Sequence, residues 1–155
     1  MSKSLKRVRA ALDASGIETE IRETALARTA KDAADAIGCA VDQIAKSIIF
    51  RGMQSEYAIL FITAGGNQVD PEKARALAGE DLGKADAGML RSQTGLAIGG
   101  VSPAGHLNPI NAFWDPRPSE FDLIWAAAGT PHHVFSAAPE ALIGISGAVS
   151  GDFTT

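Results

Sequence analysis

Residues 46–62, KSIIFRGMQSEYAILFI, decide the fold class of this chain. Two apolar runs, 47–50 and 57–62, flank a polar segment that is short enough to be a connecting turn. Both runs are apolar on both faces, which is typical of central strands covered by helices. We therefore predict two strands in the interior of a sheet, with helices from the rest of the chain packed against it.

Helix signals occur on both sides of this strand pair. Apolar residues recur there at helical spacing, capping residues stand before several of the segments, and glycines close others. The predicted helices lie at 5–15 with Ser4 as cap, at 30–37 with Thr29, at 71–78 with Asp70, at 87–92 and, as one last turn, at 139–142.

Further strands are predicted by apolar runs and by alternation of apolar and polar residues. They lie at 17–21, 96–98, 110–114, 123–128 and 134–135. The proline-rich segment 115–118 indicates a rigid turn, and 150–155 are expected to fray. Helices gather in the first half and strands in the second, which does not favour a regular parallel α/β fold. We predict an α+β (mixed α/β) fold with a curved, barrel-like mixed sheet and helices packed around it.

Length and composition fit one soluble domain over 1–155. A chain of 155 residues can bury about 70% of its unfolded surface in one core, and its 46% hydrophobic and 21% charged residues are ordinary values. The basic N-terminal stretch has no apolar core of a signal peptide, and no run approaches the ~20 apolar residues that span a bilayer. We expect a cytoplasmic protein without a membrane partner. Cys39, the single cysteine, excludes an intrachain disulfide and is expected to fill a small space in the core.

The net charge of −4 argues against a protein that coats duplex nucleic acid with a basic face. We expect no DNA partner. Contact with the end of a nucleic acid needs few phosphate contacts, so local charge decides it rather than the total.

Lys46 is the first candidate for chemistry. It stands directly before the apolar run 47–50, where a charged side chain shares space with residues directed to the core. One interpretation is an edge lysine whose stem lies on apolar surface while its ammonium reaches water. The other is an ammonium that points into a pocket and holds an anion or a developing negative charge.

The segment 99–105, GGVSPAG, is the second candidate. It lacks the patterns of a phosphate loop and of a dinucleotide-binding loop. Its glycines allow the backbone to approach a ligand, Pro103 fixes part of the curve, and exposed N–H groups can receive an oxyanion or a carbonyl. A tight connection between strand and loop is the alternative.

Small residues at 126–129 end a later strand, where they can form a pocket floor or let a helix pack closely. His132 and His133 follow, but neighbouring residues of a strand face opposite sides and do not easily bind one metal. We expect no metal and no cofactor. Neither a Gly-x-Ser-x-Gly elbow nor a Cys-His arrangement stands out, so a hydrolase built on this sequence would act on an already activated bond by positioning water.

Five segments in sequence order, spread over about 17–142, resemble the YbaK/prolyl-tRNA synthetase-associated editing-domain family. They are 29–34 (TAKDAA), 43–47 (QIAKS), 69–70 (VD), 99–105 (GGVSPAG) and 127–129 (AAG). The resemblance implies a free-standing aminoacyl-tRNA deacylase that acts in trans on a mischarged tRNA, usually the tRNA for proline. Its partners would be the acceptor end of aminoacyl-tRNA and prolyl-tRNA synthetase.

The resemblance also implies a set of site residues. Catalytic roles fall on Lys46, Gly100 and Ser102, and substrate contacts on Gly99, Val101, Pro103, Gly105, Gly129 and His133. Members specific for alanine commonly carry asparagine after the lysine, whereas this chain has Ser47, which argues against alanine as the substrate. The GGVSP loop looks more like the branch that includes cysteinyl-tRNA(Pro) deacylases.

Our mechanistic hypothesis is that N–H groups at 100–102 hold the ester carbonyl while Lys46 orients the terminal adenosine or its phosphate. Water, a substrate hydroxyl or the side chain of the substrate would attack. Two other functions fit the same pocket: a non-catalytic module that binds a tRNA acceptor end or a nucleotide, and a hydrolase for another small activated ester.

Overall fold

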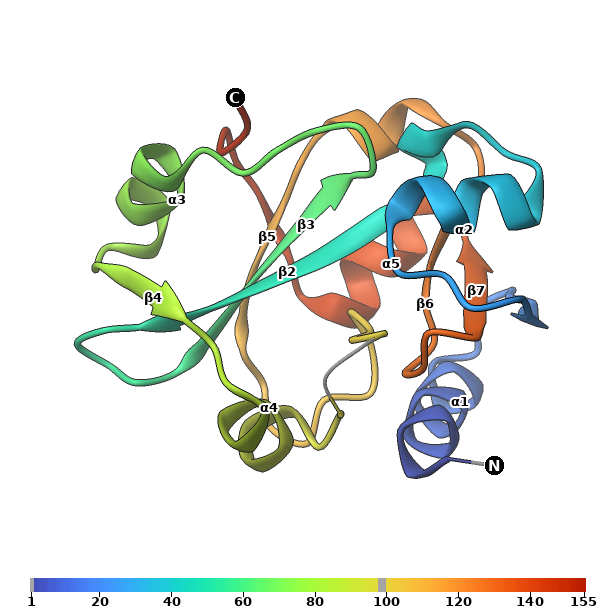
Figure 1. The fold of residues 1–155 in the computed structure, drawn as a ribbon, viewed down its shortest axis with the longest axis horizontal. Helices are drawn as coiled ribbons and strands as arrows, with labels where there is room; N and C mark the ends of the chain where they lie inside the picture. Colours follow the sequence, from blue (N-terminus) through green and yellow to red (C-terminus); the bar gives the residue numbers. More distant parts are fainter. Residues whose placement is uncertain (1, 98–99) are drawn as a thin grey trace.

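A five-stranded mixed sheet beside a three-stranded antiparallel sheet forms the frame of the computed structural model, which describes residues 2–97 and 100–155 (Figure 1). The helices are α1 (Lys3–Ser15), α2 (Ala30–Ile37), α3 (Pro71–Ala78), α4 (Ala87–Thr94) and α5 (Pro139–Ser146), with 3-10 turns η1 (Val41–Gln43) and η2 (Arg117–Glu120). The strands are β1 (Ile21–Glu23), β2 (Ala45–Gly52), β3 (Ala58–Ala64), β4 (Leu82–Lys84), β5 (Asn111–Trp114), β6 (Ile124–Ala127), β7 (His133–Ala137) and β8 (Val149–Ser150).

The larger sheet has the strand order β4-β2-β3-β5-β8. β2 and β3 are antiparallel, with Lys46 opposite Thr63, whereas β3 and β5 run parallel and β8 continues parallel to β5. Every residue of β3 is buried, as predicted for a strand that is apolar on both faces, and β2 is half-buried over most of its length. The two neighbouring strands predicted from 46–62 are therefore confirmed.

The smaller sheet has the order β1-β7-β6, and all its pairs are antiparallel. One isolated bridge, between Ile44 and Trp125, joins it to the start of β2. The α+β class is confirmed, and the predicted curved sheet consists of these two ladders. Over residues 2–97 and 100–155 the strands do not close into a complete barrel.

Three apolar clusters hold the elements together. The largest lies between α1, α5 and the inner strands and contains Leu12, Trp114 and Phe135. A second joins α2 to Trp125 and Val134, and so fixes α2 against the smaller sheet. The third surrounds Phe61, whose ring centroid lies 5.2 Å from that of Phe113 and 5.0 Å from that of Phe153. Burial of such rings is a main favourable contribution to folding.

The helix caps follow the sequence signals with one correction. Thr29 and Asp70 cap α2 and α3 as predicted, and Gly16 closes α1 at φ 70°. The prediction for Ser4 is wrong, because α1 begins two residues earlier and Ser2 accepts the N–H of Leu5. Ser4 is buried instead, and its hydroxyl accepts the N–H of Ala97 at 3.1 Å.

Strand boundaries are corrected at two places. The predicted strand 17–21 becomes regular only at Ile21, because Thr19 and Glu20 bond to the carbonyl and hydroxyl of Ser136 outside the ladder. The prediction of a strand at 96–98 is wrong for its first two residues, whose N–H groups bond to the hydroxyls of Thr94 and Ser4. Ile98 lies outside the described residues.

The strands predicted at 110–114 and 123–128 are slightly shorter, as β5 and β6, whereas β7 and α5 are longer than predicted. β7 spans five residues and α5 eight, where the sequence indicated a two-residue strand and one helical turn. The turn predicted at 115–118 leads into η2. The expectation that 150–155 fray is wrong, because Phe153 is fully buried and its carbonyl accepts the N–H of Asp70 at 2.7 Å.

Among the described residues, none of the helices has the length and apolar character needed to cross a bilayer.

Candidate functional site

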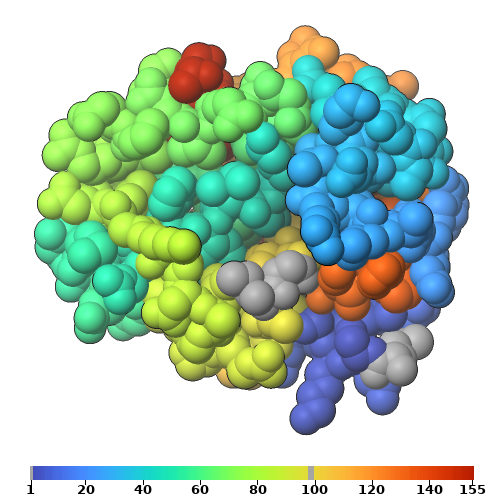
Figure 2. All heavy atoms as spheres, in the orientation of Figure 1, coloured from blue at the N-terminus to red at the C-terminus, as the bar shows by residue number. Residues whose placement is uncertain are grey.

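A cavity of about 510 Å³ opens where the two sheets meet. Its wall is formed by the N-terminal end of α2, the start of β2, the turn after β3, residues 100–101 and the segment 125–134. These segments come from distant parts of the sequence, and Figure 2 shows α2 and the segment near residue 130 side by side on one face. The site is therefore a product of the tertiary fold.

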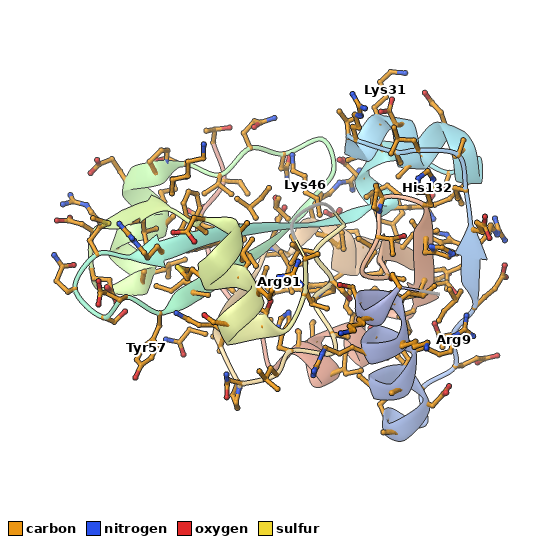
Figure 3. The ribbon with its side chains drawn as sticks, turned by 60° about the horizontal axis from the view of Figure 1, so that its bottom comes forward. Arg9, Lys31, Lys46, Tyr57, Arg91 and His132 are labelled. Carbon is orange, nitrogen blue, oxygen red and sulfur yellow. The ribbon has the colours of Figure 1, made fainter. Side chains whose placement is uncertain are left out.

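Lys46 is the second residue of β2 and lines this cavity (Figure 3). Its Nζ donates to the carbonyl of Gly65 at 3.3 Å, which leaves two of its three donors for another acceptor. Burial lowers the pKa of Lys46 from its ordinary value, and the carboxylate of Asp42 partly opposes this shift. The ammonium is thus held in a partly desolvated place, where an anion would interact with it more strongly than in water.

The turn that holds Lys46 is fixed by the buried carboxylate of Asp115. Its Oδ2 accepts from the hydroxyl of Thr63 at 2.9 Å, the N–H of Ala64 at 3.0 Å and the side-chain amide of Asn67 at 2.8 Å. Its Oδ1 accepts the N–H of Arg117 at 3.0 Å. Burial alone would raise the pKa of Asp115, but these four donors stabilise the charged form and lower its pKa below the ordinary value.

We expect Asp115→Asn to destabilise the protein by about 1–3 kcal/mol at pH 7. Both carboxylate oxygens of Asp115 accept hydrogen bonds, whereas the NH2 group of asparagine cannot accept one. The lowered pKa means that the stabilisation by Asp115 is present above its unfolded pKa of about 4 and is lost as the pH falls through the lower folded value. The difference in free energy of unfolding between wild type and variant, measured by urea unfolding, should therefore become smaller as the pH is lowered from 7 to 3. The exposed Asp122→Asn serves as control, and an unchanged difference at both pH values would contradict this role of Asp115.

Gly100 belongs to another part of the cavity wall. It has φ +80°, and its carbonyl accepts the N–H of Gly129 at 3.0 Å. A β-carbon at Gly100 would lie 2.7 Å from the Cα of Thr130 and closer still to its carbonyl group, so only glycine fits here. Gly100 and Val101 line the cavity together with Lys46. Gly99 lies outside the described residues.

The rest of the loop turns away from the cavity. Ser102 is fully buried, its hydroxyl accepts the N–H of Ala104 at 3.1 Å, and its carbonyl lies 2.7 Å from Nε2 of His106. Pro103 is buried, and Gly105 has φ +82° and approaches α1 closely. These three residues do not line the cavity, and their contacts shape the loop that presents Gly100.

Gly129 packs against α1, whereas His133 lies on the cavity wall. Gly129 has φ +95°, and a β-carbon there would lie 2.8 Å from the backbone of Ser4, so this glycine allows α1 to pack closely. His133 lines the cavity, and its Nδ1 lies 2.7 Å from the hydroxyl of Thr130. His132 is exposed and is not part of the cavity wall.

Several lining residues were not singled out as site residues in the sequence. Arg28 and Lys31 stand at the N-terminal end of α2, and Trp125 and Gln68 close other parts of the wall. Small side chains cover much of the remaining surface: Ala27, Ala30, Ala33, Ala45, Ala126 and Ala127. The only sequence signal was the segment 29–34, which carries the cap and small-residue stripe of α2.

The described residues hold no group of three or more His, Cys, Asp or Glu side chains that could hold a metal ion. Cys39 is partly buried against the cluster of α2 and Trp125, and burial raises the pKa of its thiol. A thiolate is therefore disfavoured at this position.

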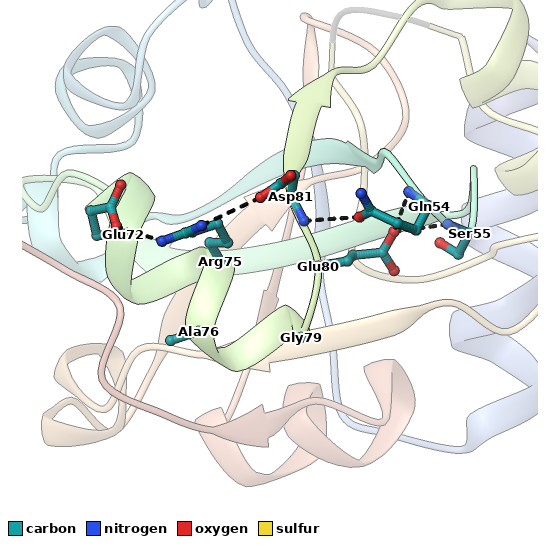
Figure 4. A pocket seen from close by; sticks show the side chains of 8 residues that line it. All are labelled: Gln54, Ser55, Glu72, Arg75, Ala76, Gly79, Glu80 and Asp81. Carbon is teal, nitrogen blue, oxygen red and sulfur yellow. Dashed lines mark hydrogen bonds and ion pairs between the residues drawn. The ribbon is translucent and has the colours of Figure 1, made fainter.

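A second hollow, of about 740 Å³, lies on a different part of the surface (Figure 4). Its polar groups bond to one another: Arg75 pairs with Glu72 and Asp81, and Glu80 accepts the N–H groups of Gln54 and Ser55. Hydrogen bonds to Ser55 are the main cause that lowers the pKa of Glu80. This hollow contains none of the predicted site residues, and its contacts hold α3 to the β2–β3 turn.

Comparison with known proteins gives a consistent result. The family model for the aminoacyl-tRNA editing domain matches residues 24–145. The uncharacterized protein YwhH of Bacillus subtilis (strain 168) is 30% identical over 140 residues, which cover 90% of this chain and 88% of that protein. A crystal structure of a proposed trans-editing enzyme for prolyl tRNA synthetase superposes with a TM-score of 0.91 at 39% identity, covering 100% of this chain and 99% of the other. The hypothetical protein APE2540 shares the fold, with a TM-score of 0.85 at 21% identity over 96% of this chain and 99% of its own.

Proposed function

Because this chain belongs to the aminoacyl-tRNA editing domain family, we propose that it hydrolyses the ester bond of a mischarged tRNA in trans, with tRNA(Pro) as the substrate. The observation that carries the proposal is the convergence of Lys46 and Gly100 on one cavity. The likeness to a proposed trans-editing enzyme for prolyl tRNA synthetase favours tRNA(Pro), released by that synthetase, over other tRNAs.

The cavity suits the aminoacylated end of a tRNA. Its volume of about 510 Å³ is that of a small-ligand site, and its alanines leave room for a small side chain together with the terminal ribose. Lys31 is paired with Asp35 at 2.9 Å, so Lys46 and Arg28 supply the positive charge around the cavity. We infer that these cations receive the terminal phosphate, while the apolar part of the wall contacts the amino acid.

In the proposed reaction, water adds to the ester carbonyl and the bond from the carbonyl carbon to the ribose oxygen breaks. The products are the free amino acid and a tRNA with its terminal hydroxyl restored. Negative charge develops on the carbonyl oxygen in the transition state, and we assign to it the backbone N–H groups of Gly100 and Val101, which line the cavity. Lys46 holds the adenosine end so that the ester lies against this loop.

Two predicted residues receive revised roles in this proposal. Ser102 shapes the loop and does not contact the substrate, since it is fully buried away from the cavity and its hydroxyl accepts the N–H of Ala104. His133 lies on the cavity wall with Nδ1 oriented by Thr130, and we propose that it contacts the substrate there. Pro103, Gly105 and Gly129 hold the loop and α1 in place.

A panel of mischarged tRNAs tests the proposal. Purified protein is mixed with tRNA(Pro) and control tRNAs that carry alanine, cysteine, serine, threonine or the correct amino acid, and the remaining ester is followed with time. We expect loss of ester above the spontaneous rate for at least one mischarged tRNA(Pro) and none for correctly charged prolyl-tRNA. Binding without loss of ester would support a non-catalytic module instead. Equal hydrolysis of simple activated esters would support a general esterase.

A further inference from the structure

The exposed face of α1 is strongly basic in an acidic protein. The helix carries four cations, Lys3, Lys6, Arg7 and Arg9, and one acid, Asp13, whereas the whole chain has a net charge of −4. Its apolar residues Leu5, Val8 and Leu12 are buried, so the cations occupy the opposite side. Lys3, Lys6 and Arg9 are exposed, and Arg7 is half-buried. We call these four side chains the α1 basic face.

The charges of this face are not compensated within the protein. Over residues 2–97 and 100–155, none of the four lies within 4.0 Å of a carboxylate oxygen. Five of the ten basic side chains outside α1 do have such partners: Arg22, Lys31, Lys73, Arg75 and Arg117. A local group of unpaired cations in an acidic chain produces a field that favours one anionic partner at one place.

The helix lies directly behind the loop that forms the cavity wall. The hydroxyl of Ser4 accepts the N–H of Ala97. A β-carbon at Gly129 would lie 2.8 Å from the backbone of Ser4, so the helix packs directly on this glycine. Gly129 in turn donates to the carbonyl of Gly100, which lines the cavity. Figure 2 shows α1 on the same face as the segment near residue 130 and α2. The helix that carries the basic face thus packs, through its buried side, on the loop that lines the cavity.

The α1 basic face extends toward α4, where Arg91 adds a further cation. The Nε of Arg7 lies 2.8 Å from the place where a β-carbon of Gly95 would stand, so the guanidinium rests against the C-terminal end of α4. Arg91, in the last turn of α4, is exposed. Figure 3 shows Arg9, Arg91 and Lys46 on the three elements concerned, α1, α4 and β2.

We propose that the α1 basic face binds backbone phosphates of the acceptor stem of the tRNA whose charged end enters the cavity, an inference that rests on the proposed function. A 13-residue helix is about 20 Å long, enough to contact several successive phosphates. Because the apolar side of α1 is buried in the core, the helix has no free apolar face to insert into a membrane. Nucleic acid phosphate is therefore favoured over lipid headgroups.

The test compares two triple variants with equal changes in charge. Lys3→Gln/Lys6→Gln/Arg9→Gln neutralises the basic face but keeps Arg7 against α4, whereas Lys73→Gln/Arg75→Gln/Lys84→Gln neutralises cations on α3 and β4. For mischarged tRNA at about 0.1 M salt, we expect KM of the α1 variant to rise roughly tenfold or more with kcat unchanged. The plot of log(kcat/KM) against log[salt] should also become shallower by about 2–3. The α3–β4 variant should match wild type.

A substrate without a stem separates binding of the stem from damage to the site. All three proteins should hydrolyse aminoacyl-adenosine equally, because it lacks the phosphates that α1 would contact. A loss of activity of the α1 variant on aminoacyl-adenosine, or equal KM values of the two variants on tRNA, would overturn the proposal. The proposal would also be overturned if both variants bind uncharged tRNA equally while the wild type binds vesicles of anionic phospholipid.

The same experiment distinguishes failure of this inference from failure of the proposed function. If wild type hydrolyses neither tRNA ester nor aminoacyl-adenosine, the proposed function fails. The inference is then decided by binding of uncharged tRNA alone, where weaker binding by the α1 variant than by the α3–β4 variant supports it and equal binding overturns it.

Discussion

Replacing Lys46 with alanine is expected to slow deacylation of the mischarged tRNA at least about a hundredfold, the scale on which loss of one transition-state contact acts. The protein should stay folded. Lys46 is half-buried, and within 2–97 and 100–155 its ammonium makes one hydrogen bond, a 3.3 Å contact with the carbonyl of Gly65. Burial lowers its pKa, so removal of the ammonium relieves a desolvation cost. Single-turnover hydrolysis measures the chemical step, and urea unfolding measures stability.

Two further variants make this result specific. Lys84→Ala removes an exposed cation of β4 and should leave hydrolysis unchanged. Lys46→Arg keeps the charge but changes its shape and reach, and should recover part of the lost rate. Near-normal turnover by Lys46→Ala would remove this side chain from the mechanism, and the function would then have to rest on the loop alone.

Gly100→Ala is expected to destabilise the protein by about 3 kcal/mol or more and to abolish hydrolysis in the fraction that stays folded. Two costs add at this position. A non-glycine residue at positive φ costs about 1–2 kcal/mol, and the new methyl group meets the backbone of Thr130, which cannot move aside as a flexible side chain can. Urea unfolding gives the free energy, and deacylation at low temperature gives the activity of the folded fraction.

Two glycines of the same chain separate these costs. Gly16 has φ +70° and open space around it, so Gly16→Ala should cost only the conformational part, about 1–2 kcal/mol. Gly144 lies inside α5 with open space and an ordinary φ, and Gly144→Ala should stabilise the helix by about 0.5–1 kcal/mol. Unfolding of Gly100→Ala at the same urea concentration as Gly16→Ala would contradict the predicted clash.

The parts of the fold that the sequence predicts are those fixed by local chemistry. Thr29 and Asp70 cap helices because their oxygens accept N–H groups two or three residues later, a contact that depends on neighbours in the chain. β3 is recognisable because 58–62 are five consecutive apolar residues, a run short enough for a strand that is buried on both faces. The same reasoning places Lys46 on a strand and Gly100 in a loop.

Contacts between distant segments could not be predicted from single residues. The burial of Phe153 depends on Phe61 and on the parallel pairing of β8 with β5, neither of which leaves a mark in the last residues of the chain. Asp115 looked like part of a proline turn, and three of its four donors come from the distant segment 63–67. The buried hydroxyl of Ser102 is likewise set by the tertiary position of its loop.

The two walls of the cavity differ in how they respond to mutation. One wall is backbone, with Gly100 held at positive φ against Thr130, where substitution is blocked by geometry. The other carries alanines on α2, β2 and β6, where larger side chains would reduce the volume without changing the loop. Under the proposed function, evolution could therefore change which amino acid is rejected through the alanine wall while the reaction itself is inherited intact.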